Sequence, residues 1–211
     1  MHARFRRLPM LSVVAAALLL ALGIDARAAM LGDAALSYSA RRTVTVDGHS
    51  YSGMVFHVPG HERHEQEIAG MTEVILLDAS AKQGVLLLPS IKAYVDFAFP
   101  ALMAELDDPA LRRAPLGHET VSGVMTTKYR IDHTAADGSH ARGFAWVSAQ
   151  GVLMRIEGIF MRPGAARETA INMELAHLKP GPQDRRLFEL PAGLLQLPSA
   201  ALQAFLMGQQ Q

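Results

Sequence analysis

Apolar and polar residues alternate with a period of two along most of this chain. Tyr129 and Ile131 are flanked by polar residues, and apolar positions alternate with polar ones in 154–157 and 171–175. Successive side chains of a strand point to opposite faces of a sheet, so this pattern predicts β-strands that are buried on one face.

Turn residues fall between these segments. An Asp-Gly pair at 47–48 separates strands expected at 42–46 and 50–58, and a second Asp-Gly pair at 137–138 separates two further strands. Asp-Gly between alternating segments indicates a tight hairpin turn. The short connections therefore predict an antiparallel meander.

Two segments are apolar without alternation. The runs at 74–77 and 85–88 predict a hairpin that is covered on both faces. Short helices are expected at 100–106 and from residue 198 onward. With about ten strands in all, the fold class is mainly β (α+β), one strongly curved antiparallel sheet or incomplete barrel.

The N-terminus has the three parts of a secretory signal in order. Arg4, Arg6 and Arg7 precede the apolar run 11–22, and a small-residue site at 26–28 follows. The run is shorter than the roughly 20 residues of a membrane span, which disfavours the alternative of an uncleaved anchor. We therefore expect a signal peptide at 1–28, a β domain at 29–197, and a C-terminal helical segment with a polar tail at 198–211. The mature protein is expected in the periplasm without a stable membrane span.

Composition excludes several classes of function. The chain has no cysteine, which removes disulfides, thiol catalysis and cysteine-ligated metals. Cleavage of the signal removes four arginines and one aspartate from 20 basic and 20 acidic residues, so the mature chain is slightly acidic. It has no basic patch for nucleic acid or an anionic membrane surface. It also has no nucleophile elbow, phosphate loop or dinucleotide motif, so we expect no enzymatic activity and no cofactor.

Several short motifs occur in a fixed order. They are Val58-Pro59-Gly60 with His61-Glu62-Arg63, Glu119-Thr120-Val121-Ser122-Gly123, Gly151-Val152-Leu153-Met154-Arg155, Gly181-Pro182-Gln183-Asp184, Leu187-Phe188 and Pro191-Ala192-Gly193. This series resembles an uncharacterised family of exported bacterial proteins grouped with the outer-membrane lipoprotein carriers (LolA/LolB-like). The resemblance covers about residues 36–193. It implies a half-open antiparallel β-barrel of a Gram-negative envelope, with short helices over an apolar concave side that holds acyl chains.

The carriers begin with a longer amphipathic helix than residues 29–37 allow. This departure bears on lipoprotein handling more than on the fold.

The apolar residues of the strands are candidates for a ligand surface. Methionine is flexible and polarizable and adapts to varied apolar partners, and the chain has 11 methionines. An ordinary filled core uses the same residues, so both interpretations stay open. The proposed apolar lining consists of Met54, Phe56, Phe144, Trp146, Met154, Ile156, Met173 and Phe205.

Histidines concentrate next to the Pro59-Gly60 turn. His57, His61 and His64 lie among glutamates, and His and carboxylate side chains are zinc ligands. Their spacing matches no closed zinc motif, and a charged, solvated strand end explains the segment more simply. The set is a weak metal candidate.

The leading hypothesis is a periplasmic carrier that binds a lipid, an acyl chain or another hydrophobic ligand. The alternative is an envelope protein-interaction module with a filled core and a partner at the sheet edge or at the C-terminal segment. A metal-binding protein that uses the histidines is the third hypothesis.

Overall fold

The computed structural model describes residues 34–68, 71–98 and 115–198. Their strands are β1 (Tyr38–Val46), β2 (His49–Val58), β3 (His61–Ile68), β4 (Met71–Asp78), β5 (Gln83–Leu88), β6 (Ala93–Ala98), β7 (Pro115–Val121), β8 (Val124–Thr134), β9 (His140–Ser148), β10 (Leu153–Met161), β11 (Thr169–Pro180) and β12 (Leu195–Gln196). Two short 3-10 turns, η1 (Pro89–Ile91) and η3 (Arg185–Phe188), also belong to this part of the chain. The expected signal peptide, the helices at 100–106 and after 198, and Phe205 lie outside the described residues.

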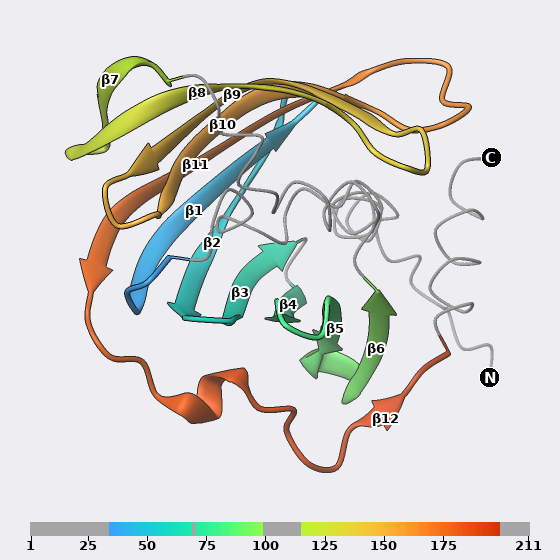
Figure 1. The fold of residues 1–211 in the computed structure, drawn as a ribbon. Coiled ribbons are helices and arrows are strands. Elements are labelled where there is room, and N and C mark those ends of the chain that lie inside the picture. The colour runs from blue at the N-terminus through green and yellow to red at the C-terminus, as the bar shows by residue number, and fades with distance from the viewer. Residues whose placement is uncertain (1–33, 69–70, 99–114, 199–211) are drawn as a thin grey trace.

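One curved sheet contains all twelve described strands, in the order β12-β6-β5-β4-β3-β2-β1-β11-β10-β9-β8-β7. Every pairing is antiparallel except that of β12 with β6. The sheet consists of two meanders, β1–β6 and β7–β11, joined where β1 pairs with β11. Figure 1 shows β7–β11 and β1 curving over β3–β6, with the sheet left unclosed. The predicted fold class, a curved and half-open antiparallel sheet, is confirmed.

The tight turns explain the meanders. Asp47 and Gly48 have φ values of 46° and 86°, and Ser122 and Gly123 have 46° and 83°. Positive φ at both central residues defines the turn that matches the twist of a β-hairpin, which is why Asp-Gly and Ser-Gly occur here. The hairpins predicted at 47–48 and 137–138 are confirmed by the register of β1 with β2 and of β8 with β9. Ser122-Gly123 forms a further hairpin turn, between β7 and β8.

The two faces of the sheet differ. We call the face that carries Val44, Val55 and Met173 the inner face, and the face that carries Thr43 and Met54 the outer face. In β4 and β5 both faces are buried: Val74 and Leu76 pack with Leu87 in one cluster, and the alternating residues of the same strands are also buried. The hairpin predicted to be covered on both faces is confirmed.

The charged segment 61–67 does not form a solvated strand end. It is β3, an internal strand paired with β2 and β4, and its side chains at Glu62, His64 and Gln66 are at most 6% exposed. These polar groups are buried because they bond to one another and to neighbouring strands.

Candidate functional site

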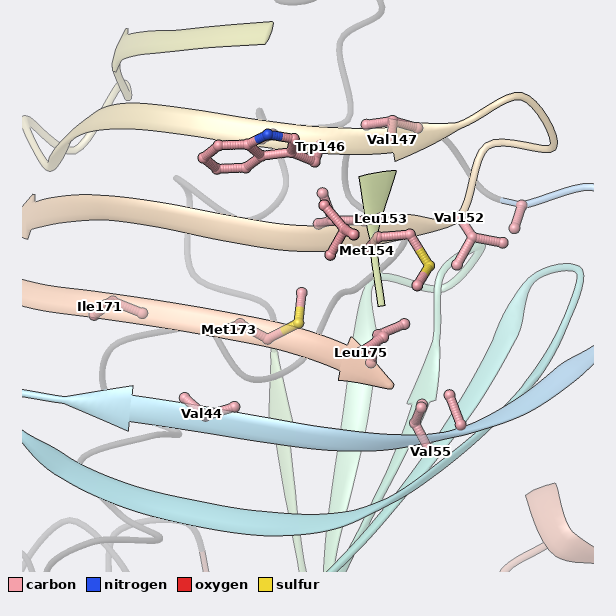
Figure 2. Close-up of a cluster of buried hydrophobic side chains, with 14 of the residues drawn as sticks. Val44, Val55, Trp146, Val147, Val152, Leu153, Met154, Ile171, Met173 and Leu175 are labelled. Carbon is pink, nitrogen blue, oxygen red and sulfur yellow. The ribbon is translucent and has the colours of Figure 1, made fainter. Parts of the chain in front are cut away.

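The inner face of β1, β2 and β11 forms a continuous apolar surface. Val44 of β1 is paired with Met173 of β11, and the buried Leu175 and Ile171 flank Met173 along β11. Val55 of β2 extends the surface on the other side of β1. Figure 2 shows these side chains on neighbouring strands of one cluster. Alternation selects the buried set of each strand, and the register of β1 with β2 and β11 places these sets on one face.

The predicted lining residues divide between the two faces. Ile156 pairs with Met173 and shares its inner face. Phe144 and Trp146 pair with Glu157 and Arg155, which places both aromatic residues on the outer face. Their side chains therefore leave the sheet on the face opposite Met173, although Trp146 and Met173 belong to one buried cluster.

Two further lining residues lie on the outer face. Met54 and Phe56 alternate with the inner-facing Val55 and His57 of β2. Met154 is fully buried in the same core cluster as Met173, at a register shift between β9 and β10.

Trp146 is enclosed by charged side chains. Its indole Nε1 donates a hydrogen bond of 2.7 Å to Glu119. The Lys128 ammonium lies 4.6 Å from the ring centroid, and the Arg155 guanidinium lies 5.4 Å from it. Cations over an indole face are attracted by the ring quadrupole, so these long side chains cover Trp146 and leave it only 1% exposed. Trp146 thus packs under charged side chains of the outer face and is not exposed to a ligand in this arrangement.

A buried polar network occupies the inner face beside the apolar surface. Glu62 of β3 lies between two histidines, with Oε1 3.2 Å from His57 Nδ1 and Oε2 2.8 Å from His64 Nε2. The guanidinium of Arg42 bonds to His64 Nδ1, and His57 Nε2 lies 3.0 Å from the carbonyl oxygen of Ala34. The network therefore connects β1, β2 and β3 with the segment that precedes β1.

The partners show how each histidine ring is oriented. A guanidinium only donates, so His64 Nδ1 accepts from Arg42, and its Nε2–H donates to Glu62. The two ring nitrogens of His57 face the carbonyl oxygen of Ala34 and the carboxylate of Glu62, which are both acceptors. Tyr38 stacks on the His57 ring at a centroid distance of 4.8 Å.

The charge of Glu62 follows from the same contacts. Burial raises the pKa of its carboxyl, but the hydrogen bonds from His57 and His64 outweigh burial and lower the pKa from 4.5 to about 2. Glu62 is thus ionised at neutral pH. A buried charge is tolerated when it is paired and hydrogen-bonded, as it is here.

The polar row continues along the same strand. Gln66 Nε2 donates to Glu73 Oε2 of β4 at 3.4 Å, and both side chains are buried. Sequence reasoning missed this row. The available signal was the period-two spacing of Glu62, His64 and Gln66, which places all three on one face of a strand.

The histidines do not assemble as the weak metal hypothesis requires. His57 and His64 meet through Glu62, whereas His61 is on the outer side, with its ring 6.4 Å from that of Phe188. His61 and His64 are three residues apart on one strand, so they point to opposite faces. Within the described ranges, no group of three or more potential ligands is arranged to hold a metal ion.

A cleft of about 680 Å³ opens where the β2–β3 turn meets η3. Pro59 and His61 line it from the turn, and Pro182, Arg185 and Phe188 line it from the C-terminal segment. Two motifs that lie far apart in the sequence, at 58–61 and 181–188, therefore come together here. A hydrogen bond of 3.0 Å from Arg63 Nη1 to the carbonyl oxygen of Leu187 attaches η3 to β3 beside the cleft.

No protein-family model and no curated protein sequence matches this chain. Solved structures give partial matches. An uncharacterized conserved protein from Thermus thermophilus has a TM-score of 0.48 at 12% identity, over 78% of this chain and 91% of that chain. MucB from Pseudomonas aeruginosa, solved in complex with MucA, has a TM-score of 0.48 at 10% identity, over 78% of this chain and 59% of that chain.

A DUF1329 family protein from Desulfovibrio piger has a TM-score of 0.37 at 11% identity, over 84% of this chain and 98% of that chain. Similarity at this level assigns neither an activity nor a partner to this chain.

In the described part of the chain, no helix is both long enough and apolar enough to span a membrane.

Proposed function

We propose that the protein is a non-enzymatic binding protein of the cell envelope that holds an acyl chain or another hydrophobic ligand against the inner face of its sheet. The observation that supports it is the apolar cluster of Val44, Val55 and Met173 on the inner face of a sheet that is not closed. These side chains are at most 4% exposed, so a ligand reaches them by displacing the groups that cover them. An unclosed sheet gives a long apolar molecule a lateral route to this surface, which a closed barrel of packed side chains does not.

The direct test is native mass spectrometry of the chain from residue 29, purified from the periplasm of its own host, followed by solvent extraction and lipid identification. Co-purifying lipid supports the proposal. The proposal is contradicted if the measured mass equals that of the apoprotein and the delipidated protein does not bind a fluorescent fatty acid.

A matched pair of variants locates the binding surface. Ile156 is half-buried on the inner face beside Met173, and Glu157 follows it on the outer face of the same strand. Ile156→Gln is expected to weaken binding of the fluorescent fatty acid several-fold, because it places an amide in the apolar surface. Glu157→Gln leaves binding unchanged. Equal effects of the two variants place the ligand elsewhere.

A protein-interaction module is the second candidate, and the cleft beside η3 favours it. The cleft combines the apolar side chains of Pro59 and Phe188 with the guanidinium of Arg185, which has no ion-pair partner among the described residues. Apolar surface with a few polar groups is typical of recognition sites. Loss of a co-purifying protein on Arg185→Glu, with fatty-acid binding intact, supports this second candidate.

A further inference from the structure

Within the part of the chain that the structure describes, β7 is the last strand of the sheet and has a backbone edge without a neighbouring strand. Of the described strands, β7 pairs with β8 alone, and the side chains from Pro115 to Thr120 are all exposed. Strand edges of this kind are templates for pairing with another chain. Pro115 has no N–H to donate and Val121 ends the strand at the turn, so the usable edge is 116–120, with a register shift before Gly117.

The turn before β8 determines which backbone groups face outward. Val121 and Val124 flank the two-residue turn, so they form a hydrogen-bonded pair. Alternation then directs the N–H and C=O groups of Thr120 and His118 away from β8. No described strand pairs with these groups, which suit pairing with a further strand.

The edge is held in place by side chains. Glu119 accepts hydrogen bonds from Trp146 Nε1 at 2.7 Å and from Lys128 Nζ at 3.2 Å, and its backbone carbonyl accepts one from Thr126 Oγ1 at 2.6 Å. A strand fixed by three such bonds loses little conformational freedom when another strand binds to it. Next to the edge, Leu116 and Met125 are 49% and 63% exposed.

We propose that β7 pairs with β7 of a second copy of this chain, antiparallel and with His118 on the two-fold axis. In this register Gly117 lies opposite Glu119 of the second copy, which places that carboxylate beside Lys128, the β8 neighbour of Gly117. Leu116 lies next to Thr120 of the second copy and, beyond it, Met125. Each copy thus covers the exposed apolar side chains of the other and offers a cation to its carboxylate, so the edge is self-complementary.

The absence of cysteine makes the register directly testable. In the proposed register, His118→Cys places two thiols opposite each other at the axis, within the Cα separation that a disulfide bridges. Mild oxidation of the purified chain is expected to convert this variant to a covalent dimer. Ala149→Cys, in the exposed β9–β10 turn, is the control and is expected to remain monomeric. Equal crosslinking of the two variants overturns the proposal.

Sedimentation of the cysteine-free protein tests the same interface without a crosslink. An edge of five residues makes a small interface, so we expect a dissociation constant on the order of 100 µM. Thr120→Pro removes an outward N–H, and His118→Asp sets two carboxylates opposite each other while the backbone stays unchanged. Both variants are expected to remain monomeric at about 500 µM.

Three outcomes overturn this assembly. The first is a wild-type protein that is monomeric at about 500 µM, and the second is self-association that persists in both variants. The third is a His118→Cys protein that crosslinks to a different polypeptide in envelope extract but not to itself. The last outcome assigns the edge to a foreign strand.

Discussion

Glu62 gives the sharpest test of the buried network. A carboxyl pKa lowered from 4.5 to about 2 by bonds from two histidines corresponds to about 3 kcal/mol in favour of the folded, ionised state at neutral pH. Glu62→Gln keeps the shape but removes the charge and leaves an imidazole donor without an acceptor. We therefore expect the free energy of unfolding at pH 7 to fall by about 3 kcal/mol.

The direction of the pH dependence follows from the lowered pKa. The folded-state pKa of Glu62 is below its unfolded value, so its stabilising contribution is complete above pH 4.5 and is lost as the pH falls toward 2. Wild-type protein should lose this contribution across that window, and Glu62→Gln should not. Urea unfolding at several pH values, monitored by fluorescence of the only tryptophan, Trp146, measures both.

Glu65 is the matched control for Glu62. It lies on the same strand but on the opposite face, where it is partly exposed and pairs with Arg63 at 2.6 Å. Glu65→Gln should cost less than about 1 kcal/mol, as exposed ion pairs do, and should retain the acid dependence of the wild type. The reasoning is refuted if the stability of Glu62→Gln falls in parallel with that of the wild type between pH 5 and pH 2.

Three further substitutions test the packing of the sheet. Trp146→Phe should reduce the free energy of unfolding by about 1–3 kcal/mol in urea titrations followed by circular dichroism, because Glu119 loses its indole donor. Gly53→Ala should cost at least about 2 kcal/mol in the same assay, since its new Cβ would clash with the backbone carbonyl oxygen of Glu65 in β3. The ring of Phe97 covers Gly84 across the β5–β6 pair, so Phe97→Ala should lower the thermal midpoint by several degrees. An unchanged midpoint would show that this cover contributes nothing.

Local patterns predicted most of the strands. The Asp-Gly turn at 47–48 and the apolar runs at 74–77 and 85–88 were enough to predict their hairpins, because turn chemistry and burial act within a few residues. About ten strands were expected, and the described sheet has twelve. The short β12 carries no alternation of its own and is held by its pairing with β6.

Sequence reasoning failed where the environment of a residue depends on distant strands. Segment 61–67 is polar in composition, and only pairing with β2 shows that Glu62 meets His57. Similarly, Trp146 and Met173 each belong to an alternating strand, but alternation does not show which face of one strand continues which face of the next. The register from β9 through β10 to β11 resolves this, and it separates the predicted ligand residues into two sets.

The joining of the two meanders at β1 and β11 has a consequence for how the chain folds. Each meander is held by neighbours in sequence, so its hairpins can form early and with little loss of loop entropy. The β1–β11 pair connects strands near opposite ends of the described chain, and it completes the environment of Val44 and Met173. We therefore expect this pairing to limit the folding rate. A chain that ends before β11 is expected to leave two loosely packed meanders whose unpaired edge strands aggregate.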